Sequence, residues 1–508
     1  MSQIKSSSQE VKQVVIVGGG TAGWMTAASL AKYFQGRSAK ILVIESSEIG
    51  TVGVGEATIP NIIDFNNRLG INEIDFIKST QASFKLGIQF ENWSTPGSEF
   101  FHPFADYGMK IDNVDFHHYI NRANTEGFNL KLQNYCFANV LAKHGKFAQP
   151  HPNPSTPIAN YSYAYHFDAG LYANYLKTFS LKLGVQHIDA KVSKVNLRTS
   201  DGFIESLELE NGETIAGDLF VDCSGFKGLL IEEALQTGYE SWQQWLFCDR
   251  AVAIQTRSTD EPTPFTRSIA HENGWQWRIP LQHRVGNGYI YSSKYESDSS
   301  AESRLLTSIE GETINRPRHF SFHPGRRKQI WNKNCIAIGL SSGFLEPLES
   351  TSISLIQSAI AKLLTFFPDM SFDPADIAEV NRLHNSEVEH VRDFLILHYK
   401  LSKRTDSEFW RDCQSMEIPE TLSHKIDLFK SRGHIISHEN ESFEPASWLT
   451  MYDAFGIVPK RYDPRANLPA LDMITTNLQK MKDSLDNAAL QVLSHQSFID
   501  KHCKSEMP

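Results

Sequence analysis

The feature that most constrains the fold is a glycine-rich turn near the start of the chain. A short β-branched run at 13–17 precedes the motif Gly18-x-Gly20-x-x-Gly23. An apolar helical segment follows the motif, and then a second strand-like run that ends on Glu45. Strand, turn, helix and strand in this order predict a βαβ unit and therefore a parallel sheet.

The same turn has the chemistry of a dinucleotide site. Gly18 permits a tight turn, Gly20 lets the backbone approach a pyrophosphate, and Gly23 lets the helix pack closely on the sheet. Glu45 lies about 20 residues further on, where a carboxylate accepts hydrogen bonds from ribose hydroxyls. A tight turn without a ligand is the alternative, but the strand-turn-helix-strand-acid context favours a cofactor. The predicted contacts in the turn are Gly18, Gly20, Thr21, Ala22 and Gly23.

A second element indicates FAD rather than NAD. The strand-like run at 218–222 ends on Asp222 and is soon followed by Gly225. It resembles the element with which flavoproteins of the glutathione-reductase and hydroxylase type contact the flavin side of the dinucleotide. Only one GxGxxG motif is present. Reducing equivalents therefore arrive as reduced flavin made elsewhere, or from NAD(P)H bound without a motif.

The predicted nucleotide-binding pieces are spread along the chain, near 13–60, 216–230 and 333–366. Antiparallel strand patterns lie between them, and helical patterns dominate afterwards. We expect an α/β fold with a Rossmann-like, FAD-binding core and an interleaved antiparallel sheet. The expected division is a core with its substrate-side β layer at 1–365 and a mainly helical, substrate-covering part at 366–508.

Composition excludes several classes of function. The 49 Lys+Arg residues against 59 Asp+Glu residues give a net charge of -10, which disfavours nucleic acid and anionic membrane surfaces as partners. No apolar run reaches the roughly 18 residues of a membrane span. The 6 cysteines form no CxxC pair, so neither disulfides nor a metal site is predicted. We expect a cytoplasmic protein.

Five motifs together resemble the flavin-dependent tryptophan halogenase family, along most of the chain. Their combination is far more specific than any single motif. They are Gly18 to Gly23 followed by Trp24, Gly53-Val-Gly-Glu-Ala-Thr-Ile-Pro60, Ala82-Ser-Phe-Lys85-Leu-Gly, Gly274-Trp275-Gln-Trp277-Arg-Ile-Pro280, and Phe344-Leu-Glu-Pro-Leu-Glu349-Ser350-Thr351.

The resemblance implies a reaction. Reduced FAD, delivered by a separate flavin reductase, would react with oxygen and with chloride or bromide to give hypohalous acid. Lys85 would hydrogen-bond this oxidant or form a haloamine, and a small aromatic substrate would attack the halogen. Glu349 would support the cationic intermediate by its charge or by taking its proton. For Lys85 alone a solvated surface lysine is the alternative, and Lys78 offers the same chemistry by residue type.

Two further features concern the cofactor side. Trp275 and Trp277 are two residues apart, so in a strand they face one side, where they could separate flavin from substrate or simply form core. The halide would bind backbone amides near Thr351 and Ser352, at the start of the helix after Glu349. Well-known tryptophan-specific members have Gly where this chain has Ser352, which puts the halide preference in question.

The substrate side is less specific. His102 and Phe104 resemble the family's aromatic stacking segment, against the alternative of a Pro-rich surface loop, and Trp448 is a further aromatic candidate. The segment 447–456 cannot be matched to a clamp for the amino and carboxylate groups of free tryptophan. We therefore predict indole or a simple indole derivative as the better substrate, attacked at C3.

Other functions are alternatives to halogenation. A flavin-dependent aromatic hydroxylase would use the same cofactor without halide, and a flavin-binding regulator would not turn over. The run 339–343 satisfies the GxSxG pattern of hydrolases, but no oxyanion motif accompanies it and Gly339 fits a turn beside the flavin. Glu387-x-x-His390 lacks the second copy that a di-iron site needs. The sequence leaves open the native substrate, the halide, the reductase and the oligomeric state, with a homodimer as one option.

Overall fold

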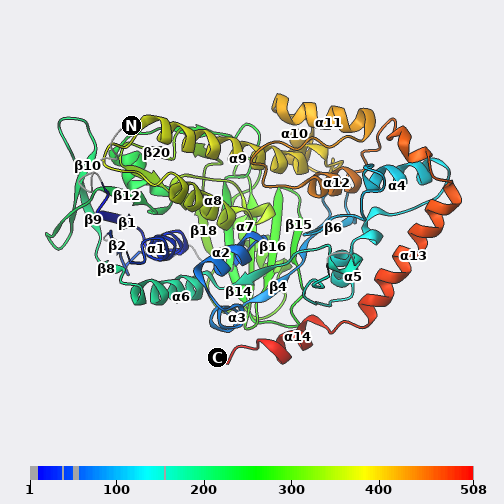
Figure 1. The fold of residues 1–508 in the computed structure, drawn as a ribbon, viewed down its shortest axis with the longest axis horizontal. Helices are drawn as coiled ribbons and strands as arrows, with labels where there is room; N and C mark the ends of the chain where they lie inside the picture. The colour runs from blue at the N-terminus through cyan, green and yellow to red at the C-terminus, as the bar shows by residue number, and fades with distance from the viewer. Residues whose placement is uncertain (1–9, 37–38, 50–55, 154–155, 507–508) are drawn as a thin grey trace, which may run out of the picture.

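The predicted nucleotide-binding pieces come together in one six-stranded sheet (Figure 1). The computed structural model describes residues 10–36, 39–49, 56–153 and 156–506. The strand order is β20-β21-β12-β1-β2-β8, and all neighbours run parallel except the short edge strand β20. The strands are β1 (Gln13–Val17), β2 (Lys40–Glu45), β8 (Gln186–Asp189), β12 (Leu219–Asp222), β20 (Trp331–Asn332) and β21 (Cys335–Ala337).

The first turn of this sheet requires glycine. Gly18 has a φ of +112°, and a Cβ there would lie 2.2 Å from the backbone oxygen of Cys223. A Cβ on Gly23 would lie 1.8 Å from the Gly18 oxygen. The helix α1 (Thr21–Tyr33) can therefore pack directly on the sheet, as the spacing predicted, and its outer side packs on α6 (Ala169–Lys182) and α8 (Ser352–Thr365).

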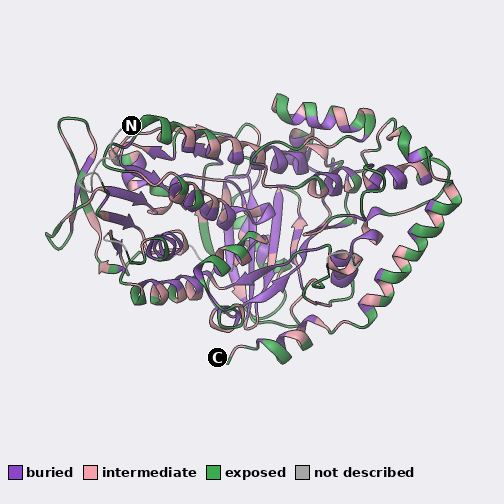
Figure 2. Ribbon diagram, viewed as in Figure 1, coloured by how far each residue is buried: buried purple, intermediate pink, exposed green. Residues whose placement is uncertain are grey.

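A seven-stranded sheet forms the middle of the molecule, and its central strands are buried (Figure 2). Its order is β18-β14-β17-β16-β15-β5-β6, antiparallel except between β15 and β5. The strands are β5 (Gly87–Glu91), β6 (Glu99–Pro103), β14 (Arg250–Thr256), β15 (Thr266–Ala270), β16 (Gly274–Pro280), β17 (Val285–Tyr291) and β18 (Arg318–Ser321).

Three small sheets complete the β structure. The one that matters for the site has the order β3-β7-β4, so β4 is an edge strand. The small sheets contain β3 (Glu56–Ala57), β7 (Ala164–Phe167) and β4 (Ser83–Lys85); β11 (Thr214–Ala216), β10 (Ile204–Leu209) and β9 (Val192–Leu197); and β13 (Tyr239–Ser241), β19 (Gly325–Arg327) and β22 (Gly343–Phe344).

Helices make up the C-terminal part. In Figure 1, α10, α11 and α12 lie together at the top, α13 runs along one edge, and α14 returns towards α3. These helices are α9 (Pro374–Leu401), α10 (Glu408–Ser415), α11 (Glu420–Arg432), α12 (Pro445–Ala454), α13 (Leu471–Leu490) and α14 (His495–His502). The remaining helices are α2 (Asn61–Leu69), α3 (Glu73–Thr80), α4 (Phe116–Thr125), α5 (Phe137–Lys143) and α7 (Asp298–Ser308).

The predicted fold class is confirmed: a parallel α/β core, an interleaved antiparallel sheet and a helical C-terminal part. The main hydrophobic core includes residues from both sides of position 365. The division into 1–365 and 366–508 stays a prediction. Within the described residues, no helix combines the length and the apolar character needed to cross a membrane.

Candidate functional site

A cavity of about 690 Å³ lies at the carboxyl ends of β1, β2 and β12 and extends over one face of the seven-stranded sheet. Carboxyl ends of parallel strands are where α/β folds bind ligands. Residues from distant parts of the chain meet there. Of the predicted cofactor contacts, Gly18, Gly20, Thr21, Ala22, Glu45, Gly225 and Gly339 line the cavity.

Asp222 has a different place from the one predicted. It is fully buried and does not line the cavity. Its carboxylate accepts hydrogen bonds from the backbone N–H groups of Ser224 (2.9 Å), Leu230 (2.8 Å) and Ile231 (2.8 Å). Asp222 therefore holds the loop after β12, and that loop supplies Gly225 to the cavity.

Glu45 is held by two basic residues that sequence reasoning missed. Its Oε1 accepts from Lys177 Nζ at 2.5 Å and lies 2.8 Å from His187 Nε2. Lys177 lies on α6 and His187 on β8, the strand that pairs with β2. Both are far from Glu45 in the sequence, so no local pattern predicts the contacts. Glu45 Oε2 lies against the glycine turn, since a Cβ on Gly19 would be 1.5 Å away. Only glycine at this position leaves room for the carboxylate.

The cavity floor contains unpaired polar atoms. Trp277 on β16 and Ser268 on β15 both line it. Trp277 Nε1 and Ser268 Oγ are buried and have no hydrogen-bond partner among the described residues. Buried polar atoms without partners are rare in folded proteins, so these two indicate a ligand or water at the floor.

Trp275 and Trp277 both line the cavity, as their spacing predicted, with ring centroids 6.1 Å apart. The Trp275 indole donates to Glu346 Oε2 at 2.8 Å, and the Tyr399 hydroxyl donates to the same oxygen at 2.5 Å. Burial raises the pKa of Glu346 to about 7. Glu346 thus fixes the orientation of one cavity tryptophan and ties it to α9, which carries Tyr399.

Lys85 lies at the end of β4 and is completely buried, so the surface-lysine alternative does not apply. Its Nζ donates to Thr58 O and to Ser350 Oγ, both at 2.9 Å, and lies 5.1 Å from the centre of the Phe104 ring. Burial lowers the pKa of Lys85 to about 7, although Glu349 opposes the shift. A substantial fraction of this amine is neutral near pH 7. Lys78, by contrast, is only half-buried on α3.

Thr58 belongs to the motif at 53–60. Its first residues, 53–55, lie outside the described residues, but the described part places the Thr58 carbonyl beside Lys85.

Glu349 is a buried carboxylate between two histidines. Its Oε2 lies 2.9 Å from His102 Nδ1 and its Oε1 lies 2.8 Å from His398 Nε2. Burial by itself raises the pKa of Glu349, but His102 and His398 outweigh it and lower the pKa to about 2. Glu349 is therefore ionised at neutral pH.

His398 lies between two hydrogen-bond acceptors. Its Nδ1 lies 2.8 Å from the backbone oxygen of Phe394, and its Nε2 faces the Glu349 carboxylate. Both neighbours accept hydrogen bonds, so the backbone of α9 and the Glu349 carboxylate together fix the orientation of the ring. Sequence reasoning missed His398 because it lies 49 residues after Glu349. Only the packing of α9 brings the two side chains together.

Ser350 connects the two predicted catalytic residues. It follows Glu349 directly and hydrogen-bonds Lys85. Its φ of +59° lies in the left-handed region, which costs a non-glycine residue about 1–3 kcal/mol. This strained turn directs the Glu349 carboxylate towards the histidines and the Ser350 hydroxyl towards Lys85.

The predicted halide residues lie at the start of α8. Thr351 is its N-cap and Ser352 its first residue, and both line the cavity. The first N–H groups of a helix have no partner within it. The Thr351 side chain makes no capping hydrogen bond to them.

The three predicted stacking residues lie in different surroundings. His102, on β6, is bound to Glu349, and its buried Nε2 has no partner within the described chain. Phe104 lies beneath the Lys85 amine. Trp448, on α12, is 1% exposed, with Lys425 Nζ 4.0 Å from the centre of its ring.

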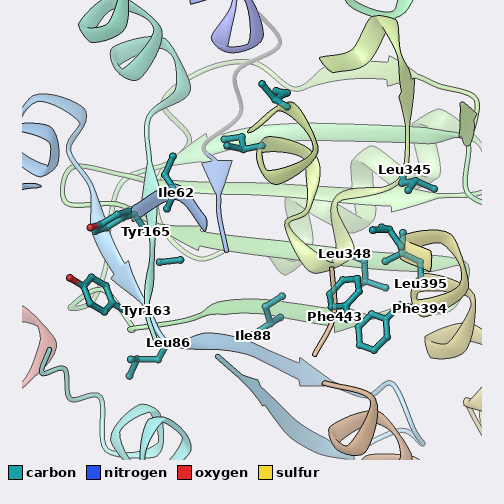
Figure 3. Packing of buried hydrophobic residues seen from close by; sticks show 14 of the residues in the cluster. Ile62, Leu86, Ile88, Tyr163, Tyr165, Leu345, Leu348, Phe394, Leu395 and Phe443 are labelled. Carbon is teal, nitrogen blue, oxygen red and sulfur yellow. The ribbon is translucent and has the colours of Figure 1, made fainter. Parts of the chain in front are cut away.

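Two aromatic residues that sequence reasoning missed extend this region. Phe394 and Phe443 stack at 3.9 Å, and both lie next to Leu348 in Figure 3. The Phe394 ring centroid is 5.8 Å from that of His102 and 5.1 Å from that of Trp448. Phe394 therefore connects His102 with α12.

The GxSxG run at 339–343 and the pair Glu387 and His390 have structural roles. The Ser341 hydroxyl donates to the backbone oxygens of Asp222 and Ile338, so it has no base to activate it. Glu387 pairs with Lys362 at 2.7 Å, whereas His390 stacks on His438. In the described part of the chain, no group of three or more His, Cys, Asp or Glu residues could hold a metal ion.

Comparisons with known proteins show the family to which the chain belongs. The family model described as Tryptophan halogenase matches residues 13–470. The 7-chloro-L-tryptophan 6-halogenase KtzR of Kutzneria sp. (strain 744) is 39% identical over 82% of this chain and 85% of its own.

Two solved structures are similar over nearly their full length. BrvH, a flavin-dependent halogenase from Brevundimonas sp. BAL3, has a TM-score of 0.94 at 46% identity and covers 96% of this chain and 99% of its own. Xcc4156, a flavin-dependent halogenase from Xanthomonas campestris, has a TM-score of 0.95 at 44% identity and covers 98% of this chain and 100% of its own. The extent of these matches shows that the chain belongs to the tryptophan halogenase family and is a flavin-dependent halogenase.

Proposed function

We propose that this enzyme halogenates an electron-rich aromatic ring, using reduced FAD from a separate flavin reductase, oxygen, and chloride or bromide. The observation that carries the proposal is the buried Lys85 amine, joined through Ser350 to the ionised Glu349, beside a cavity of dinucleotide size. A lysine with a pKa of about 7 has the neutral amine that accepting a halogen requires.

The residues of the cavity fit FAD. The turn from Gly18 to Ala22 presents backbone N–H groups to a pyrophosphate, and Glu45 accepts from a ribose. Gly225 and Gly339 line the cavity without side chains and so leave room for the cofactor. Trp277 Nε1 and Ser268 Oγ, which have no partner among the described residues, could hydrogen-bond it. When bound and reduced, FAD supplies together with oxygen the two-electron oxidation that turns the halide into hypohalous acid.

We propose that the halide binds at the N-terminus of α8. The free N–H groups near Thr351 and Ser352 face the cavity, and the positive end of the helix dipole favours an anion there. The Ser352 side chain narrows this site compared with a glycine, which favours discrimination between halides by size.

The Lys85 amine would then receive the halogen on the substrate side. Either its lone pair hydrogen-bonds hypohalous acid, or it forms an N–halogen bond and water leaves. The aromatic ring attacks the halogen and afterwards loses a proton. Trp275 and Trp277 would keep the organic substrate away from the cofactor.

For Glu349 we favour charge stabilisation over proton abstraction. A carboxylate with a pKa of about 2 is a weak base at neutral pH, and both of its oxygens are already engaged by histidines. Its negative charge nevertheless faces the region where the cationic ring intermediate forms, which lowers the energy of that intermediate.

We propose an indole or a simple indole derivative as the substrate. His102, Phe104 and Trp448 would contribute the aromatic surroundings, and no clamp for an amino acid was recognised at 447–456. With ring contacts as the main binding interaction, attack would follow intrinsic reactivity at C3. We place the reaction in the cytoplasm, where all six cysteines would stay in the free form in which they occur here.

One experiment tests the proposal. The purified chain is combined with a generic flavin reductase, FAD, NADH, bromide or chloride, and a panel of aromatic compounds, and products are identified by mass spectrometry. Halide-dependent aryl halides support it. Hydroxylated products that form without halide would assign an aromatic hydroxylase, and FAD binding without any product would assign a regulator.

A further inference from the structure

The strand that carries Lys85 has an open edge. Within the described residues, β4 pairs only with β7, through Ser83, Phe84 and Lys85. The backbone N–H groups on its other side need partners, because a buried N–H group without one is costly. Leu86 N–H donates to Pro264 O at 2.7 Å. For Phe84 N–H, no neighbouring strand among the described residues provides an acceptor.

The partner of the Phe84 N–H group is a side chain from the far end of the sequence. His495, the first residue of α14, accepts this hydrogen bond with Nε2 at 3.1 Å. Its Nδ1 lies 2.7 Å from the backbone oxygen of Pro262. Because that oxygen can only accept, Nδ1 carries the proton and Nε2 carries the lone pair. The ring thus bridges β4 and the loop before β15 in a single neutral tautomer.

Burial stabilises the neutral form of this ring. His495 is 1% exposed, and burial lowers its pKa to about 4. The Pro262 carbonyl works in the opposite direction without reversing the shift. The hydrogen bond to Phe84 therefore persists throughout the neutral pH range.

The rest of the C-terminal segment holds His495 in place. Phe498 packs edge-on against Phe84, with ring centroids 5.3 Å apart. His495 N–H donates to Gly145 O at 2.9 Å, and Ser505 Oγ donates to Lys78 O at 2.8 Å. In Figure 1, α14 accordingly ends close to α3, although almost the whole sequence separates them.

Lys85 directly follows Phe84, so the position of its amine depends on this edge. Both acceptors of Lys85 Nζ, Thr58 O and Ser350 Oγ, belong to other segments and lie at 2.9 Å. An outward shift of β4 would lengthen both contacts. A displacement of about 1 Å at a reacting group can cost roughly 100-fold in rate.

We propose that His495 is a positioning residue for Lys85: it takes the place of a neighbouring strand at the open edge of β4 and thereby holds the amine in the site. This inference rests on the proposed role of Lys85. It assigns a catalytic contribution to α14, a helix that contributes no residue to the cofactor cavity.

Two substitutions separate the two hydrogen bonds of the ring. In His495→Gln, the longer side chain places its amide oxygen near the position of Nε2, so this oxygen can still accept from Phe84 N–H. In His495→Asn, the amide reaches only the place of Nδ1, so the Pro262 bond is kept and Phe84 N–H is left unpaired. Ser505→Ala is the matched control, since it loosens the same segment away from Phe84.

The assay measures two products in the same tube. Aryl halide is quantified by mass spectrometry, and hypohalous acid is quantified as the sulfoxide that it forms from a water-soluble thioether. We expect His495→Asn to lower the ratio of aryl halide to hypohalous acid by roughly 10- to 100-fold, whereas His495→Gln and Ser505→Ala keep it within a few-fold of the unmodified enzyme. General destabilisation would lower both products together and leave the ratio unchanged.

The other outcomes are decisive as well. An unchanged ratio in His495→Asn, or equal losses in the Asn and Gln variants, would overturn the inference. If His495→Asn does not fold, Phe498→Leu replaces it, and an unchanged ratio there overturns the inference too. Lys85→Ala is measured in parallel, because normal aryl halide formation in that variant would refute the proposed function and not the role of His495 alone.

Discussion

Replacing Glu349 by glutamine tests the electrostatic role of the carboxylate. The substitution keeps the shape of a buried side chain and removes its negative charge. The His398 ring can keep both contacts, since Nε2 of its neutral form accepts from the new amide while Nδ1 donates to Phe394 O. We therefore expect Glu349→Gln to fold and to bind FAD.

The expected loss follows from the surroundings of Glu349. The carboxylate is 1% exposed, so little water screens its charge from a cationic intermediate. Removing one preorganised stabilising group of this kind costs about 2–4 kcal/mol, roughly 30- to 1000-fold in rate. The loss should appear in the rate of aryl halide formation at saturating substrate, whereas hypohalous acid formation stays normal.

The same residue links stability to pH. The pKa of Glu349 is about 2 in the folded chain and 4.5 in the reference state, so the folded state binds this proton less tightly. Its contribution to stability, on the order of 3 kcal/mol, is present above about pH 4.5 and is lost as the pH falls towards 2. In Glu349→Gln, urea unfolding should show a weaker loss of stability across this window.

The assay compares single-turnover halogenation by the unmodified enzyme and Glu349→Gln, with Glu346→Gln as the control. Glu346 is an equally buried glutamate three residues earlier that contacts Trp275 and Tyr399. Equal rates for Glu349→Gln and the unmodified enzyme would refute the electrostatic argument and leave Glu349 with a packing role.

Four further predictions concern the rest of the site. Lys85→Ala should abolish aryl halide formation while hypohalous acid still forms, and Lys78→Ala should have a mild effect; near-normal product from Lys85→Ala would contradict the assignment. The ratio of aryl halide to hypohalous acid should rise as the pH increases through 7, because the neutral Lys85 amine predominates above its pKa. A ratio that stays constant from pH 6 to 8 would argue against a role for the neutral amine. The chain with FAD should oxidise NADPH only slowly until a flavin reductase is added, which absorbance at 340 nm measures; rapid oxidation without the reductase would show a nicotinamide site. In competition, indole should outcompete tryptophan and be substituted at C3; dominant halotryptophan substituted on the benzo ring would reveal an amino-acid clamp.

Local features of the site could be predicted from the sequence. The turn at Gly18 and Gly23 was predicted correctly, because the close approach of Gly23 to the Gly18 oxygen is local, although Gly18 itself also lies against the distant backbone of Cys223. Lys85 and Glu349 were found through motifs, and the structure brings them together through Ser350.

Features that depend on distant segments could not be predicted. The lowered pKa of Glu349 depends on His102 and His398, and the edge of β4 depends on His495. Asp222 illustrates the limit in another way. The sequence predicts correctly that an acid ends this strand. Only the folded structure shows that its oxygens accept from backbone N–H groups of the following loop and that Asp222 does not line the cavity.

One consequence for enzyme engineering follows from α9. His398 and Tyr399 are neighbours on this helix, and they hold Glu349 and Glu346 respectively. Both glutamates lie in the same short segment before α8: Glu349 has the charge-stabilising role proposed above, and Glu346 anchors a tryptophan of the cavity. Displacing α9 to widen the substrate side would therefore also loosen Trp275, one of the two tryptophans that we propose separate the substrate from the cofactor. Libraries for bulkier substrates are better directed to Phe443 and α12, which belong to the same aromatic cluster but, among the described residues, form no hydrogen bond with either glutamate.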